Sequence, residues 1–164
     1  EAAIRHIPVG VCHGSRFLKG VSENREPFRY LNVPENRIRF ARLAILYGWA
    51  FVASDHQFLY RKEPPNLVFS HDHGHFFPGG PNWSVESLTK ASAARPDSTI
   101  LEKCDFTEAE INEALDSLRV VEASHIAHAV AQPPDTWGLS LDDRIALACY
   151  LDARREQLLA GGHF

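Results

Sequence analysis

The sequence contains no methionine, few cysteines, no long apolar run and no excess of basic residues. Because an unprocessed chain begins with methionine, we expect this sequence to be the C-terminal part of a longer gene product, with N-terminal processing as the alternative. The cysteines are odd in number and lack the spacing of a metal site. They therefore predict reduced, packed thiols of the kind found in cytoplasmic proteins. They are Cys12, Cys104 and Cys149.

The charge balance and the hydropathy exclude two classes of partner. The formal net charge is -4 at pH 7, which gives no basic footprint for nucleic acid. The longest apolar run, Ala41 to Ala53, is interrupted by Arg42 and is too short to span a bilayer. The chain of 164 residues is 45% hydrophobic. We therefore expect residues 1–164 to form a single cytoplasmic domain that binds neither nucleic acid nor a membrane.

Helical patterns dominate the chain. Pro34 starts a helix expected over residues 36–53, which is apolar on nearly every side and should therefore be buried. Residues 19–32 are polar and irregular, so we expect a surface loop there. Three further starts are predicted later in the chain, two of them with capping-box spacing. They are Thr107 with Glu110, Ser124, and Ser140 with Asp143, the last opening a helix that should end at Gly161.

One short hairpin interrupts the helices. The apolar runs Phe58–Tyr60 and Leu67–Phe69 flank the turn-forming segment Glu63–Asn66, which contains two prolines. Two β-type runs around such a turn predict antiparallel strands. The expected fold class is α+β, mostly α, with helices packed around a single small β-hairpin.

Acidic and histidine residues stand at both outer ends of this hairpin. Asp55-His56 precedes it, and the segment His71–His75, which reads HDHGH, follows it. A hairpin brings its outer ends together, so the carboxylates of Asp55 and Asp72 should lie near each other. Paired carboxylates backed by imidazoles suit binding a divalent cation or moving a proton. The simpler alternative is that each Asp only forms a turn or a cap.

The three histidines of the second cluster allow two interpretations. Continued strand alternation would put Asp72 and Gly74 on one face and the histidines on the other. His71, His73 and His75 could then chelate zinc as an open, catalytic three-histidine site. Alternatively, His73 and His75 orient acidic side chains and loop carbonyls through hydrogen bonds, which is the interpretation that we favour.

At these residues the chain resembles a known family. Phosphotransferases of the protein-kinase-like fold have a buried helix, a catalytic Asp, a short hairpin and a metal-binding Asp in that order. The segments FVASDHQFLY, VFSHDHGHFFPGGPNW and CHGSRF resemble the HipA-like kinase domain, a relative of HipA and of phosphatidylinositol kinases. Pro134–Trp137 and the helix carrying Arg154-Arg155 fit the end of such domains. The resemblance covers most of the chain and implies the C-terminal lobe of a two-lobed enzyme.

The resemblance implies a role for each matching residue. Asp55 resembles the Asp that accepts or orients the proton of the acceptor hydroxyl, which we expect to be a protein Ser or Thr side chain. Asp72 resembles the Asp that holds Mg²⁺ across the phosphates of ATP. Gln57 would supply a further oxygen to the metal and the nucleotide. The side chains of three histidines would orient these groups without binding the metal or the nucleotide themselves. They are His56, His73 and His75.

Two departures and one absence limit this resemblance. Tyr60 stands where protein kinases place a metal-binding Asn, and His56 stands where Arg is usual. The glycine-rich phosphate loop and the phosphate lysine belong to an N-terminal lobe, which we expect in the same gene product before Glu1. The chain alone should therefore be inactive. The alternatives are a degenerate kinase fold kept as a binding or regulatory module, and a metal-dependent hydrolase that uses the histidine cluster.

Overall fold

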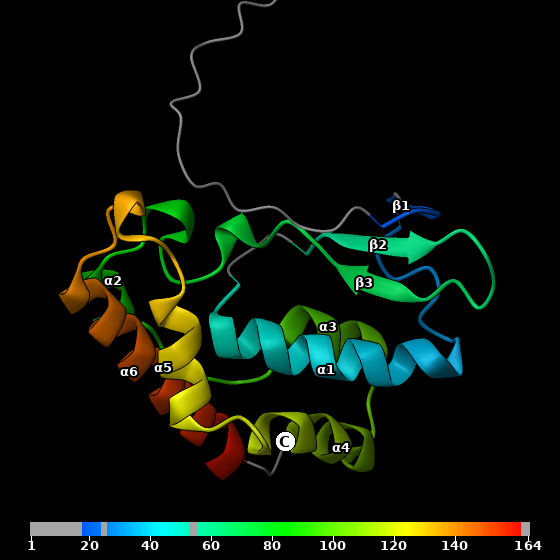
Figure 1. Cartoon of the computed structure of the whole chain (residues 1–164). Coiled ribbons are helices and arrows are strands. Elements are labelled where there is room, and N and C mark those ends of the chain that lie inside the picture. Colours follow the sequence, from blue (N-terminus) through cyan, green and yellow to red (C-terminus); the bar gives the residue numbers. More distant parts are fainter. Residues whose placement is uncertain (1–17, 24–25, 53–55, 162–164) are drawn as a thin grey trace, which may run out of the picture.

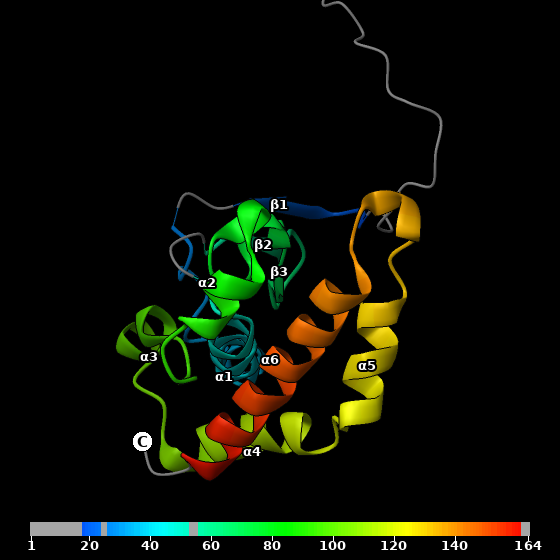
Figure 2. The same cartoon turned by 90° about the vertical axis from the view of Figure 1, so that its left-hand side faces the viewer.

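The computed structural model describes residues 18–23, 26–52 and 56–161. These residues form a mostly helical α+β domain with a small antiparallel sheet (Figures 1 and 2). None of the described helices is long and apolar enough to cross a membrane. The strands are β1 (Val21–Glu23), β2 (Phe58–Arg61) and β3 (Val68–Ser70). The helices are α1 (Pro34–Ala50), α2 (Val85–Thr89), α3 (Ser98–Cys104), α4 (Glu108–Arg119), α5 (Ala123–Ala131) and α6 (Leu141–Ala160).

The long helix α1 lies at the centre of the domain. The sheet covers one side of it, α4 lies on the other side, and α6 crosses near its end (Figures 1 and 2). The helix begins at Pro34, two residues before the predicted start, and ends at Ala50 rather than at residue 53. It ends there because Phe51 takes a left-handed conformation with φ 65°. Its buried residues are Asn36, Phe40, Ala41, Ala44, Ile45, Tyr47, Gly48 and Ala50.

The predicted hairpin is confirmed, and it belongs to a sheet of order β1-β2-β3. Strand β2 pairs with β3 through Leu59 opposite Phe69. Residues 21–23 lie in the segment expected to be a surface loop, and that prediction is wrong because they pair with β2 as strand β1. A strand of three residues is too short to show alternation.

Helix α1 protects the open edge of β3. The buried Asn36 side chain accepts from the Val68 N–H at 2.9 Å and donates to the carbonyls of Tyr30 and Asn66. Arg39 donates to the Val68 carbonyl at 3.3 Å. The outward backbone groups of Val68 are therefore satisfied by side chains of α1 rather than by another strand. This arrangement locks the hairpin onto the central helix.

Both predicted capping boxes are present, whereas the third predicted helix start is wrong. Thr107 with Glu110 opens α4, and Ser140 with Asp143 opens α6. The prediction for Ser124 is wrong, because α5 begins one residue earlier and the capping box there is made by Glu122 and His125.

The described cysteines differ from the prediction in part. Cys104 is buried as expected, Cys149 is exposed, and Cys12 lies outside the described residues.

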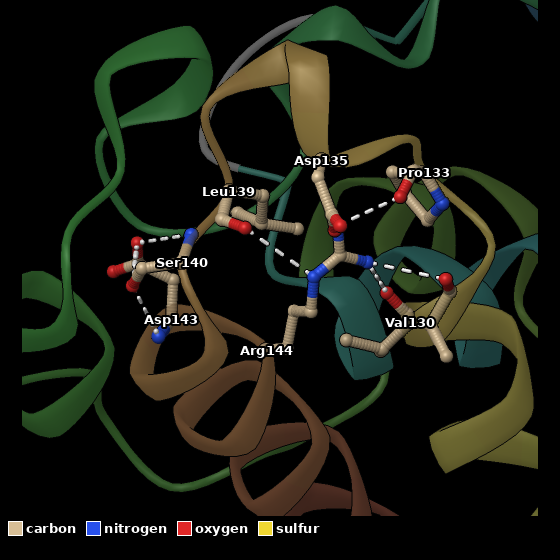
Figure 3. Close-up of polar contacts among 8 residues, drawn as sticks. Val130, Pro133, Asp135, Leu139, Ser140, Asp143 and Arg144 are labelled. Atoms are coloured by element: carbon tan, nitrogen blue, oxygen red, sulfur yellow. Dashed lines mark hydrogen bonds and ion pairs between the residues drawn. The ribbon is translucent and has the colours of Figure 1, made fainter.

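An arginine in the first turn of α6 fastens the loop between α5 and α6 (Figure 3). Arg144 donates to the carbonyls of Val130 at 3.0 Å, Pro133 at 2.7 Å and Leu139 at 3.3 Å. It also forms an ion pair with Asp135 at 3.2 Å. Because α5 leaves its last carbonyls without helical partners, this guanidinium acts as a C-terminal cap for it.

A second arginine joins three helices at the start of α1. Arg37 binds the carboxylate of Glu110 through two hydrogen bonds of 2.5 and 2.8 Å, and it donates to the carbonyls of Cys104 and Asp105. Its hydrogen bonds lower the pKa of Glu110 to about 2, with Thr107 contributing as well. Since protonation of Glu110 breaks this pair, the stability that it provides is present above the usual carboxyl pKa and is lost as the pH falls from about 5 to 2.

We expect Glu110→Gln to lower the free energy of unfolding at pH 7 by roughly 1–2 kcal/mol, a figure reduced for solvent screening of partly exposed groups. The variant should also lose less stability than the parent protein between pH 5 and pH 3. Urea denaturation at both pH values measures the two effects. Glu113→Gln is the control, because Glu113 is mostly exposed and lies 3.9 Å from Arg42. Equal effects of the two substitutions would contradict the assignment.

Candidate functional site

The two acidic-histidine clusters flank the hairpin, and the structure describes most of their residues. Asp55 lies outside the described residues. His56, the next residue, is anchored to the domain by its Nε2 atom, which lies 2.8 Å from Oδ1 of Asp97. Both side chains are nearly buried, with 11% and 9% exposed. Asp97 also caps α3, and its N–H donates to the Ala44 carbonyl at 2.8 Å. The chain is therefore held to α1 and α3 directly after Asp55.

The sheet ladder continues beyond the ends of β2 and β3. The N–H of His71 donates to the carbonyl of Gln57 at 3.2 Å. This bond places the backbone of Gln57 opposite His71, one residue before Asp72. The hairpin thus brings Gln57 and Asp72 to the same end of the sheet, whereas the predicted proximity of Asp55 and Asp72 stays a prediction because Asp55 lies outside the described residues.

Asp72 is exposed and has a left-handed backbone, with φ 53° and ψ 69°. Its carboxylate makes no capping hydrogen bond to the short 3₁₀ helix η1 (His73–His75) that follows. A Cβ atom on Gly74 would lie 3.5 Å from Oδ1 of Asp72, which is ordinary van der Waals contact. An exposed carboxylate without a capping role can bind a hydrated cation such as Mg²⁺.

The predicted alternation of the histidines is wrong. Strand β3 ends at Ser70, and the left-handed turn at Asp72 leads into the 3₁₀ helix. Successive side chains of a 3₁₀ helix point about 120° apart, so His73 and His75 do not share a strand face with His71. Within the described ranges, no three or more His, Cys, Asp or Glu residues are placed to hold a metal ion. The three histidines therefore do not form the zinc site of the hydrolase alternative.

His73 is committed to contacts within the protein. Its Nε2 atom lies 2.8 Å from Oγ of Ser70, and its ring centroid lies 4.6 Å from that of Phe76. Burial lowers the pKa of His73, and nearby His71 lowers it further, whereas Asp72 raises it. His75 is exposed and lies beside Gly80. The hydrogen bond between His73 and Ser70 therefore engages a serine hydroxyl rather than an acidic side chain or a loop carbonyl, and the predicted supporting role of His73 stays a prediction.

Three residues near this site were not identified from the sequence. The hydroxyl of Tyr47 lies 2.5 Å from Oγ of Ser70, which in turn contacts His73. Asp97 is the third, as the partner of His56. Only Asp97 carries a local signal, because an Asp before a Ser-Thr pair favours a helix N-cap. The contacts of Tyr47 and Ser70 join distant segments and leave no pattern in the sequence.

The outer face of the sheet has apolar side chains that do not belong to the core. Phe58, Tyr60 and Val68 point toward α1 and form part of a core cluster. Leu59 and Phe69, which are paired across the strands, belong to none of the core clusters of the described residues. Because side chains alternate across a sheet, they lie on the opposite face. Both side chains are half-buried, and the Phe69 ring centroid lies 5.2 Å from the guanidinium of Arg39 and 5.7 Å from that of Arg61.

A cleft of about 440 Å³ adjoins the other side of the site. Its walls come from the end of α1 and from the segment that leads into α3. They include Tyr47, Phe51, Val52, Arg95 and Asp97. The cleft is therefore lined by Val52 and by Asp97, the partner of His56.

Comparisons with protein-family models, with curated proteins and with solved structures gave no match to this chain. The functional argument therefore depends on the residues of the site and on their geometry.

Proposed function

We propose that this chain is the catalytic lobe of an ATP- and Mg²⁺-dependent phosphotransferase of the HipA-like kinase type. One observation carries the proposal. The hairpin brings the backbone of Gln57 against His71, so that Asp72 stands exposed at the same end of the sheet as Gln57. Phosphoryl transfer requires mainly positioning and neutralisation of charge, and a carboxylate at such a place can hold the metal.

The chemistry of the groups supports Asp72 as the main metal ligand. Mg²⁺ prefers oxygen ligands and is usually bound by one or two carboxylates together with waters and substrate phosphates. Asp72 would provide the carboxylate, Gln57 would add an amide oxygen, and the phosphates of ATP would complete the shell. His56, His73 and His75 would act behind these ligands, and the contacts of His56 with Asp97 and of His73 with Ser70 agree with this role.

The surroundings of Asp72 also suit a nucleotide and an acceptor. Leu59, which is half-buried on the outer sheet face, would pack against the base of ATP. Asp55 would accept or orient the proton of the acceptor hydroxyl, which we expect to be a protein Ser or Thr. The phosphate loop and lysine would come from an N-terminal lobe of the same gene product, and the protein would act in the cytoplasm.

A specific observation favours one alternative, a degenerate kinase fold that binds a partner or nucleotide without catalysis. Tyr60 stands where protein kinases have a metal-binding Asn. It is 2% exposed, and its hydroxyl donates to the carbonyl of Pro27. Tyr60 therefore points into the core and replaces no metal ligand. Phosphotransfer by the complete gene product, and its loss in Asp55→Ala, would separate the enzyme from this alternative.

The metal role of Asp72 can be tested on the chain as it stands. Mn²⁺, which replaces Mg²⁺ and broadens nearby NMR signals, should broaden the backbone amide signals of Gln57 and residues 71–75 first. Excess Mg²⁺ should reverse the broadening. Asp72→Asn should weaken Mn²⁺ binding at least about 10-fold, because the carboxylate charge provides most of the affinity.

Asp105→Asn is a matched control for this experiment. Asp105 is also exposed and left-handed, with φ 43°, but it lies at the end of α3 beside Arg37. The control should leave Mn²⁺ binding unchanged. Stoichiometric zinc that is lost on substitution of His73 and His75 would contradict the proposal, as would Mn²⁺ binding that Asp72→Asn does not weaken.

A further inference from the structure

A chain of side-chain hydrogen bonds runs from the central helix to the turn that carries Asp72. The hydroxyl of Tyr47 in α1 lies 2.5 Å from Oγ of Ser70 in β3. Oγ of Ser70 lies 2.8 Å from Nε2 of His73 in η1. The bond between Tyr47 and Ser70 joins segments that are distant in the sequence, whereas the bond between Ser70 and His73 is local to the turn.

Tyr47 is the fixed end of this chain. Tyr47 is 1% exposed, and its ring packs against three other rings. The ring centroids lie 5.3 Å from His56, 6.0 Å from Phe58 and 5.4 Å from Phe76. Burial raises the pKa of Tyr47, so its hydroxyl stays protonated at neutral pH. A buried aromatic ring in a rigid helix has little freedom, and its hydroxyl therefore defines a constant position for Ser70.

The residues of this hydrogen-bond chain flank Asp72 in the sequence. Ser70 lies two residues before Asp72, and His73 lies directly after it, so the bond between Ser70 and His73 closes a short loop around the aspartate. The backbone of Asp72 is left-handed, a conformation that few residues other than glycine adopt. Phe76 supports the same turn, because its ring contacts both Tyr47 and His73.

We propose that Tyr47 and Ser70 are positioning residues that hold Asp72 in its metal-binding orientation. Neither residue would contact the metal, the nucleotide or the acceptor. They act through His73 and the turn, in the way that outer hydrogen bonds orient metal ligands in other sites. This inference depends on the proposed function, because it assigns to Asp72 the metal of that function.

The test uses Tyr47→Phe and Ser70→Ala in the whole chain, with Mn²⁺ as the probe. Each substitution should weaken Mn²⁺ binding about 10-fold, in the range seen for outer partners of metal ligands. The double variant should bind Mn²⁺ no more weakly than either single variant, because either substitution alone already breaks the chain of hydrogen bonds. Tyr60→Phe is the matched control, since it removes another buried tyrosine hydroxyl, the one bonded to Pro27. It should leave Mn²⁺ affinity unchanged.

A second measurement separates this inference from the proposed function. The ring ¹⁵N signal of His73 Nε2, recorded without metal, should shift in Tyr47→Phe and stay in place in Tyr60→Phe. If the parent chain binds no Mn²⁺ but this shift occurs, the hydrogen-bond chain exists and the proposed metal site is wrong. If Tyr47→Phe and Ser70→Ala leave Mn²⁺ affinity within twofold of the parent, the positioning role is overturned.

Discussion

Replacing Arg154 with Met should lower the free energy of unfolding by about 3–5 kcal/mol, one of the two largest effects that we expect in this chain. Arg154 is 4% exposed and has no carboxylate partner among the described residues. Its guanidinium instead donates to the carbonyls of Gly48 at 2.6 Å, Trp49 at 2.8 Å and Ser92 at 2.8 Å. Met fills a similar volume but leaves these three carbonyls without their donor.

The position of these carbonyls explains the size of the effect. Gly48 and Trp49 lie in the last turn of α1, where carbonyls have no helical partner and carry the negative end of the helix dipole. Arg154 therefore caps α1 from a neighbouring helix. Its guanidinium also lies 5.5 Å from the Phe51 ring centroid and 5.2 Å from that of Tyr150. Burial lowers the pKa of Arg154, but an arginine remains charged.

The adjacent arginine provides the control. Among the described residues, Arg155 forms hydrogen bonds with Asp152 and Glu156, both on its own helix. Arg155→Met should therefore cost less than about 1 kcal/mol, as is usual for ion pairs near the surface. Urea denaturation followed by circular dichroism measures both variants. A similar loss in the two would contradict the capping role of Arg154.

The pair Arg154-Arg155 also shows how far periodicity predicts this fold. Leu147, Leu151 and Leu158 repeat at helical spacing, and Arg154 lies on the same stripe, three residues after Leu151 and four before Leu158. The stripe could have identified Arg154 as the buried member of the pair. Apolar character alone is a weaker guide, because Ile145 in the same helix is 52% exposed. Periodicity predicts which face of a helix is apolar, but it does not predict how much of that face a neighbouring element covers.

Local chemistry predicted the parts of the fold that depend on short-range interactions. The capping boxes of α4 and α6 need only residues three positions apart, and both are present. The hairpin needs two β-type runs and a turn, and it is also present. Strand β1 was not predicted, because its three residues form a strand only through pairing with β2. Helix α3 was not predicted either, because seven residues are too few to show a helical pattern.

The sequence identifies the proposed ligands Asp72 and Gln57, whose metal role stays a prediction, but not Tyr47 and Ser70, which pack near them. The sequence places Asp72, His73 and Gln57 close together because a hairpin joins them. It could not place Tyr47 beside Ser70, since that contact depends on how the sheet packs on α1. The histidine alternation failed for a related reason, because it assumed that β3 continues beyond Ser70. A single left-handed residue, Asp72, ends that regularity.

The second large effect is expected for Gly48→Ala, in which two opposing contributions must be compared. Alanine is favoured over glycine within a helix by up to about 1 kcal/mol. A Cβ atom on Gly48, however, would lie 2.0 Å from the carbonyl oxygen of Arg95 and 2.9 Å from Cα of Pro96. Both neighbours are backbone, so no side-chain rotation relieves the clash. We expect a net loss of about 2–3 kcal/mol, the usual cost of overpacking a close contact.

Gly74→Ala separates this clash from a general effect of replacing glycine. A Cβ atom there meets only Oδ1 of Asp72, at 3.5 Å, so stability should change by less than about 0.5 kcal/mol. In Gly48→Ala the displaced backbone leads directly to Asp97, the partner of His56. The ring signal of His56 should therefore shift in that variant. Increased stability of Gly48→Ala would show that helix propensity outweighs the contact, and that the segment before α3 yields without disturbing His56.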